Sequence, residues 1–441
     1  MTNTVQPKEG EGGDVQNFEP DSGHSDNAEP VSRSADSLLK GAAKNIAAKG
    51  VVHWLSALIV IVTGMWLGVF AENRPIGLPW RYALTQRIME AAPFKAAREN
   101  TNQTIVEVID ATVGRSPTTS PLSPSIIADL LDKCLQVRSK TCALDFDMSD
   151  PDSDHPGSWG TEFAAEVEKL WQVIRSVLED SGQIVILPVT LNAQGTGIER
   201  SYLGNLTEMQ LPPFVKLGIV NLPQDIQRFP RGVFDRKSGR FIDSLSSAIV
   251  RSKIANEANA FVTLPQTEVK PPIIMFRVPN SFPHITSEDL LNGDIAALRR
   301  QLAGRQVLIG GMWHVRNRNS GVIVDMYDSP VGPIPGVYVH ANYEEAGISG
   351  LLYDPIAPWI ALSIKFIYLT LVALVLPILE QLRTKAMILI LIVISYLLIG
   401  YVCFINGGLA LDVTIPICLI LLHALFDHIW EYHQKPIGAM S

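Results

Sequence analysis

Four hydrophobic segments constrain the fold of this chain more than any other feature of its sequence. They occupy residues 51–70, 359–379, 386–405 and 409–426. Each approaches or reaches the roughly 20 residues that a helix needs to cross a lipid bilayer. The sequence therefore predicts a large water-soluble stretch with one transmembrane helix before it and three after it.

Positive charges beside these segments predict their orientation. Basic residues lie before the first segment, between the second and third, and after the fourth: Lys40, Lys44, Lys49, Arg383, Lys385 and Lys435. The loop at residues 406–408 has none. Because cytoplasmic loops are enriched in Lys and Arg, we expect both chain ends in the cytoplasm and the central stretch outside the membrane.

The first hydrophobic segment could instead belong to a cleaved signal peptide, since residues 69–71 resemble a small-residue cleavage site. Its apolar run is longer than the roughly 7–15 residues of a signal core, and a long segment precedes it. We therefore expect an uncleaved membrane anchor.

These patterns divide the chain into a series of parts. Residues 1–35 are rich in Gly, Ser, Asp, Glu and Pro, which predicts a disordered cytoplasmic tail. The expected parts after it are a juxtamembrane segment (36–50), a first transmembrane helix (51–70), an external domain (71–357), three transmembrane helices (358–379, 386–405 and 408–428) and a cytoplasmic tail (429–441).

The external stretch alternates between strand-like and helix-like patterns. Apolar, β-branched runs predict strands at residues 104–110, 141–147, 183–190, 272–278 and 305–309. Apolar positions at helical spacing predict helices at residues 124–137, 162–180, 241–255, 286–302 and 335–352. Residues 191–237 show no clear period and are expected to be irregular. This alternation predicts an α/β domain with a mainly parallel sheet and helices on both faces.

Charge and cysteine content limit the function further. The net charge of −8 gives no overall basic field, so we expect no nucleic-acid partner. Two of the four cysteines, Cys134 and Cys142, lie in the external stretch. An oxidising compartment would allow a disulfide between them, and two buried thiols are the alternative.

Several motifs in order along the chain resemble the CHASE2 family of extracytoplasmic bacterial sensor domains. Residues 332–342 (GPIPGVYVHAN) are similar to the closing signature of that family. Residues 307–311 (VLIGG) and 328–330 (DSP) resemble its strand, glycine and Ser-Pro elements, and Asp110 and Asp145 match its two acidic strand ends. The layout of one membrane helix before the domain and three after it is also typical of the family. The resemblance covers roughly residues 71–428.

The chain also departs from the family pattern. Residues 114–124 (GRSPTTSPLSP) keep the prolines of a turn that often carries tryptophan in the family, but they lack the tryptophan. Family members usually continue into a kinase, cyclase or similar output domain, whereas this chain ends shortly after its last hydrophobic segment. We therefore expect a separate protein to supply the output.

Five polar residues are candidates for ligand binding. Asp110, Asp145 and Asp147 lie at the carboxyl ends of predicted parallel strands, which is the edge where open α/β sheets bind ligands. His340 and Asn342 are expected at the start of the last external helix, either in contact with a ligand or as a buried cap.

Metal binding and catalysis have weaker support. Residues 148–155 (MSDPDSDH) include Asp150, Asp152, Asp154 and His155, whose side chains suit a hard cation, but the spacing lacks the glycine and glutamate of an EF-hand. A solvated acidic loop is the favoured reading. The P-loop, nucleophile-elbow and H-E-x-x-H motifs are missing from the sequence, so we expect no enzyme activity, no catalytic residue, no metal and no cofactor.

The resulting hypothesis is a bacterial inner-membrane sensor in the lipid bilayer. Its external domain is expected to detect a small ligand or the state of the envelope and to signal through its helices to a cytoplasmic or membrane protein in trans, with a homodimer as a plausible form. The alternatives are an envelope docking or assembly protein and an external metal-dependent hydrolase.

Overall fold

The computed structural model describes most of the external stretch and two of the hydrophobic segments. The described residues are 103–109, 122–150, 160–176, 181–192, 195, 197–256, 271–312, 314–317, 320–323, 325–349, 352–375 and 382–407, with short pieces of 58–87 and 409–429. The tail at 1–35, the juxtamembrane segment at 36–50 and Asp110 lie outside them, as does most of the first hydrophobic segment.

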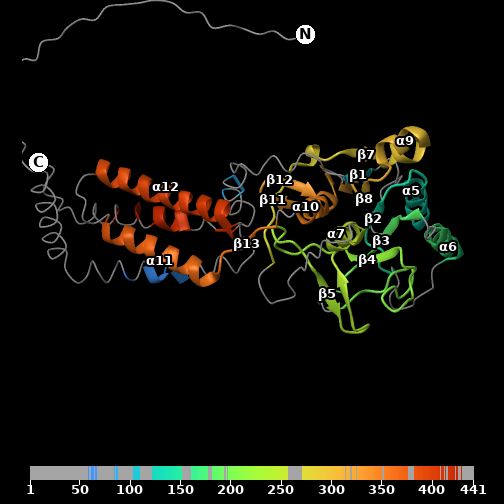
Figure 1. Cartoon of the computed structure of the whole chain (residues 1–441), viewed down its shortest axis with the longest axis horizontal. Coiled ribbons are helices and arrows are strands. Elements are labelled where there is room, and N and C mark those ends of the chain that lie inside the picture. Colours follow the sequence, from blue (N-terminus) through green and yellow to red (C-terminus); the bar gives the residue numbers. More distant parts are fainter. Residues whose placement is uncertain are drawn as a thin grey trace, which may run out of the picture. The chain divides into compact units, whose positions relative to one another are not determined.

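A six-stranded parallel sheet forms the centre of the external domain (Figure 1). From edge to edge its strands are β4 (Val215–Ile219), β3 (Ile184–Val189), β2 (Thr141–Asp145), β8 (Gln306–Gly311), β1 (Gln103–Val108) and β7 (His284–Thr286). Every neighbouring pair is parallel. The predicted mainly parallel sheet is therefore confirmed.

Burial on both faces explains why the strands read as continuous apolar runs. In β1, Ile105 and Val106 are both fully buried, but they belong to different apolar clusters. The same alternation places Ala143 and Leu144 of β2 on opposite faces. Side chains alternate along a strand, so a sheet covered on both sides needs apolar residues at every position.

Helices cover both faces, as predicted. Apolar residues of α5 (Pro124–Gln136), α6 (Thr161–Ser176), α8 (Ser287–Asn292) and α9 (Ile295–Leu302) pack on one face. Those of α7 (Leu245–Asn256) and α10 (Gly336–Ile348) pack on the other. Figure 1 shows α5 and α6 on the opposite side of the strands from α7 and α10.

Four predicted elements differ in the structure, and three of them differ in their division into helices and strands. The helix expected at 241–255 is divided into strand β6 (Arg240–Asp243) and α7, and β6 pairs with β5 (Gly232–Asp235) in a hairpin. The helix expected at 286–302 is divided into α8 and α9, because Asp294 caps α9 by accepting a hydrogen bond from the Ala297 amide. The irregular segment at 191–237 contains the edge strand β4.

The strand expected at 272–278 is not part of the sheet. This connector segment (residues 272–278) runs beside Gln227 and Phe229 on one side and Tyr353 on the other. Ile273 exchanges two backbone hydrogen bonds with Tyr353, at 2.7 and 2.9 Å. Its backbone polar groups are thus satisfied outside the sheet.

Two apolar helices follow the external domain. They are α11 (Pro358–Val375) and α12 (Leu382–Gly407), and Tyr368 of α11 packs edge-to-face on Tyr396 of α12. Within the described residues, one helix is long and apolar enough to cross a membrane: the 22-residue stretch Arg383–Phe404, with a mean hydropathy of 2.8. Trp359–Ala373 is a shorter apolar helix. The remaining predicted spans stay predictions.

Candidate functional site

Asp145 and His340 lie close together in the fold. Asp145 is the last residue of β2, where its register partner in β8 is Gly310. His340 lies inside α10, and its Nε2 is 3.6 Å from Oδ1 of Asp145. The structure therefore joins one predicted strand end to the last external helix.

His340 is fully buried, and both of its ring nitrogens have partners. Nε2 lies 3.0 Å from the carbonyl oxygen of Val220. A carbonyl only accepts, so Nε2 carries the proton and Nδ1 accepts from the Ser246 hydroxyl at 3.1 Å. Burial lowers the pKa of His340 to about 4, because the charged ring would lose its hydration. The ring is therefore neutral near pH 7, and its contact with Asp145 is not an ion pair.

The carboxyl group of Asp325 also acts on Asp145. Burial raises the pKa of Asp145 well above its usual range, and the charge of Asp325 raises it further. Burial also raises the pKa of Asp325, while a hydrogen bond from Tyr327 opposes that shift. The folded state therefore favours the protonated form of Asp145 and of Asp325 over the charged form.

Two glycines allow α10 to approach this cluster. A Cβ on Gly310 would lie 2.5 Å from Cγ2 of Val337, and a Cβ on Gly336 would overlap Oδ2 of Asp325. The helix begins at Gly336, after Pro335 as its N-cap. His340 and Asn342 therefore lie within the helix, not at its start as expected, because the Pro-Gly pair of the closing motif begins it four residues earlier.

The start of α10 covers the carboxyl end of β8. The side chains of Asp145 and His340 are only 9% and 1% exposed. A ligand would have to displace α10 to reach them, so the ligand-binding roles of these two residues remain predictions.

The acidic loop after β2 is tied to its neighbours where it is described. Asp147 accepts hydrogen bonds from the Ser149 amide and the Thr190 hydroxyl. Asp150 lies 3.7 Å from Nε of Arg200. Asp152, Asp154 and His155 lie outside the described residues. Within the part of the chain that the structure describes, no group of three or more His, Cys, Asp or Glu side chains is arranged to hold a metal ion.

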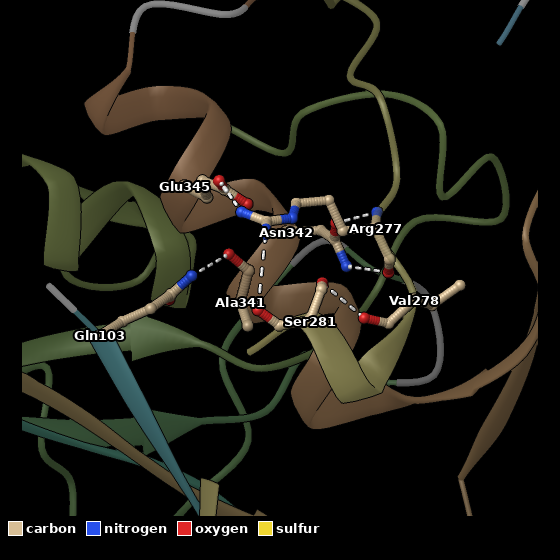
Figure 2. A network of polar contacts seen from close by, with 7 residues as sticks. All are labelled: Gln103, Arg277, Val278, Ser281, Ala341, Asn342 and Glu345. Carbon is tan, nitrogen blue, oxygen red and sulfur yellow. Dashed lines mark hydrogen bonds and ion pairs between the residues drawn. The ribbon is translucent and has the colours of Figure 1, made fainter. Parts of the chain in front are cut away.

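Asn342 binds the connector segment to α10 (Figure 2). Its Oδ1 accepts from the Arg277 amide at 2.6 Å, and its Nδ2 donates to the Arg277 carbonyl at 3.4 Å. The same Nδ2 also donates to the Tyr338 carbonyl at 2.8 Å. The Arg277 guanidinium pairs with Glu345 at 2.6 Å. Asn342 is therefore a structural link of the kind left open by the sequence, and α10 is held to the connector segment at two of its residues.

Gln86 makes the equivalent link to the neighbouring residue of the connector segment. Its Nε2 donates to the Phe276 carbonyl at 2.7 Å, and its Oε1 accepts from the Phe276 amide at 3.1 Å. Gln86 follows the first hydrophobic segment. Sequence reasoning missed Gln86, Arg277 and Ser246, because a lone amide, arginine or serine carries no pattern that names its partner. Asp325 and Tyr327 were also missed, and the signal for them in the sequence is that they lie shortly before the GPIPG motif.

Cys134 of α5 and Cys142 of β2 are paired as a disulfide in the structure, with their Cα atoms 6.5 Å apart. This separation is within the range of disulfides in proteins. The Ser139 hydroxyl lies 3.2 Å from one sulfur and 2.9 Å from the other. The geometry is thus compatible with the pairing considered from the sequence.

A comparison with protein families decides the relationship of this chain to known proteins. The model of the CHASE2 domain matches residues 57–378. The chain belongs to the CHASE2 family. No curated protein and no solved structure matches it.

The family assigns a broad role to the external domain. CHASE2 is an extracytoplasmic sensor domain, so the α/β domain described above is a sensor domain outside the cytoplasm. The CHASE2 match begins inside the first hydrophobic segment and ends inside the second. Both of its boundaries therefore fall where the chain is expected to enter the membrane.

Proposed function

We propose that this protein is a multi-pass sensor of the bacterial inner membrane. Its CHASE2 domain detects a small external ligand or the state of the envelope. The signal passes through the transmembrane helices to a separate cytoplasmic or membrane protein, and both chain ends lie in the cytoplasm. A homodimer offers a simple readout, because a change in the domain then alters the packing of helices between two subunits.

The connector segment is the observation that carries this proposal. Phe276 is bonded to Gln86, which follows the first hydrophobic segment, and Ile273 is bonded to Tyr353, which precedes α11. Arg277, the residue after Phe276, is hydrogen-bonded to Asn342 of α10. One short piece of chain thus contacts the sensor core and both membrane-proximal ends of the domain.

Through these hydrogen bonds, a shift of α10 is transmitted to both membrane-proximal ends of the domain together. A ligand changes the equilibrium between two arrangements only through its different affinity for each. A small displacement of α10 therefore suffices if it changes the fit of the connector segment. His340 is buried and both of its nitrogens have partners, so this geometry offers no support for its use as a hydrolytic base.

Two measurements test the proposal. Alkaline phosphatase fused after Arg200 should be active in intact cells, and a fluorescent protein fused after Ser441 should fold in the cytoplasm. The opposite pattern would exclude an external sensor. A photo-cross-linker at Arg383 should capture a signalling protein in living cells, and the same group at Arg300 in the external domain serves as the control. Capture at Arg300 alone would favour a docking protein of the envelope.

A further inference from the structure

A cavity of about 910 Å³ lies at the edge of the sheet, away from the carboxyl-end cluster. It is bounded by the start of β3, by β4, β6 and α7, and by the loop that precedes β4. Pockets that hold small ligands have volumes of about 300–1,000 Å³. The cavity is therefore large enough for a small organic molecule.

The polar lining of the cavity has an excess of positive charge. Three cations, Lys216, Arg240 and Arg251, face two anions, Glu208 and Asp243. Both anions already have a basic partner: Glu208 pairs with Lys237 at 3.0 Å and Asp243 with Arg251 at 3.4 Å.

Two of the cations are left without a counter-charge. Neither Lys216 nor Arg240 forms an ion pair with any residue that the structure describes. The guanidinium of Arg240 makes one long hydrogen bond, 3.4 Å, to the Thr207 carbonyl. An anion between Lys216 and Arg240 would neutralise both, and arginine suits the planar fork of a carboxylate or phosphate.

The rest of the lining specifies more of the ligand. Phe241 is 50% exposed and Met209 is 37% exposed, and both line the cavity with apolar surface. Oδ1 of Asp243 is buried and has no hydrogen-bond partner among the described residues. A ligand with an apolar body would cover the exposed side chains, and a hydroxyl or amine on it would satisfy Asp243.

We infer that this cavity binds a small organic oxyanion, in which a carboxylate or phosphate sits beside an apolar body that carries a hydrogen-bond donor. Arg240 and Lys216 hold the oxyanion, Phe241 and Met209 cover the apolar body, and Asp243 accepts from the donor. This inference rests on the proposed function, because it names the ligand class of the sensor domain.

The cavity is separated from α10 by a single helix. Ala248, Arg251 and Ser252 of α7 line the cavity, while Ser246 and Val250 of the same helix contact His340 and Gly347 of α10. A ligand bound to Asp243 changes the pairing of Asp243 with Arg251, and Arg251 belongs to the helix that supports α10. This arrangement connects the cavity to the connector segment through α7 and α10.

The test uses the full-length protein in lipid nanodiscs and small compounds that share a phenyl ring but differ in their polar groups. Benzoate, 4-hydroxybenzoate and phenyl phosphate supply the oxyanion, and benzamide is the neutral control. Calorimetric titration should show binding of the oxyanions and at least tenfold weaker binding of benzamide. The hydroxyl of 4-hydroxybenzoate should make its binding tighter than that of benzoate. Asp243→Asn should reduce this difference in affinity. A difference between benzoate and phenyl phosphate tells which oxyanion fits.

Matched variants locate the site. Arg240→Gln and Lys216→Gln should each weaken binding at least tenfold, whereas Arg300→Gln, on α9 outside the cavity, should leave it unchanged. Melting curves of the free variants establish that each is folded. Absence of binding by all three oxyanions, or equal binding to Arg240→Gln and Arg300→Gln, overturns the inference. Binding at this cavity with no change in the captured cytoplasmic partner would instead count against the proposed signalling.

Discussion

Gly347 of α10 and Val250 of α7 touch directly, so that a Cβ on Gly347 would lie 2.7 Å from Cγ2 of Val250. The same stripe of α10 carries His340 and Glu344. The contact therefore sets the distance between the helix that lines the cavity and the helix that holds the connector segment. Few substitutions fit there without moving one of the two helices.

Gly347→Ala should lower the free energy of unfolding by about 1–3 kcal/mol, because the added methyl group overpacks a close helix contact. Val250→Ala in the same chain should recover part of the loss, which a double-mutant cycle measures by chemical denaturation. Gly160→Ala is the matched control, since a Cβ there meets nothing within 4 Å. Equal losses with and without Val250 would show that the two residues are not in contact.

Gln86→Leu should release the connector segment locally. The Phe276 amide loses its acceptor, and a buried hydrogen bond contributes about 1 kcal/mol. Hydrogen exchange of that amide should become roughly fivefold faster or more. Gln136→Leu removes an exposed hydrogen bond to Asp132 and should leave the Phe276 amide unchanged. Unaltered protection in the Gln86 variant would remove the main support for the proposed coupling.

His340 should make the domain sensitive to acid. Its pKa is lowered from 6.5 to about 4 in the folded state, so the unfolded chain binds more protons between these values. Its contribution to stability is complete above pH 6.5 and is lost as the pH falls toward 4, by up to about 1.4 kcal/mol per pH unit. Denaturation curves of His340→Gln should lack this slope, and those of His284→Gln should keep it. A parallel pair of profiles for His340→Gln and the natural chain would refute the assignment.

Glu344 should act in the opposite direction. Its carboxyl group is fully buried without a hydrogen-bond partner among the described residues, and burial raises its pKa from 4.5 to about 8 against the attraction of Lys253. The repulsion of Glu345 adds to the shift. The stability that this raised pKa provides is complete below pH 4.5 and is lost as the pH rises through 8.

Glu344→Gln should therefore flatten the alkaline side of the stability profile, since a neutral amide takes the place of the carboxyl group. The free energy of unfolding at pH 8–9 should rise relative to that of the natural chain. Glu288→Gln, a similar change in α8, should leave the profile unchanged. An unaltered slope in the Glu344 variant would contradict a protonated carboxyl group between α7 and α10.

Much of the fold was accessible from local pattern, and the exceptions have physical causes. Strand β1 was predicted because its buried β-branched residues suit only a covered strand. The position of helix α10 was predicted, but its complete burial was not. Residues 336–347 are buried on every side of the helix and show no amphipathic stripe. The connector segment has the composition of a buried strand, but its partners are Tyr353 and Gln227, so tertiary contacts decided against the sheet.

The amino-acid sequence by itself determined the apolar segments, the strand and helix alternation, and the closing motif around Gly336, because hydrophobic periodicity and turn residues act through near neighbours in the chain. Only the tertiary structure decided that Gln86 binds Phe276, that His340 is buried and neutral, and that Lys216 and Arg240 share a cavity. These properties depend on atoms brought together from distant parts of the chain. Hydrogen-bond partners and desolvation are set by that packing.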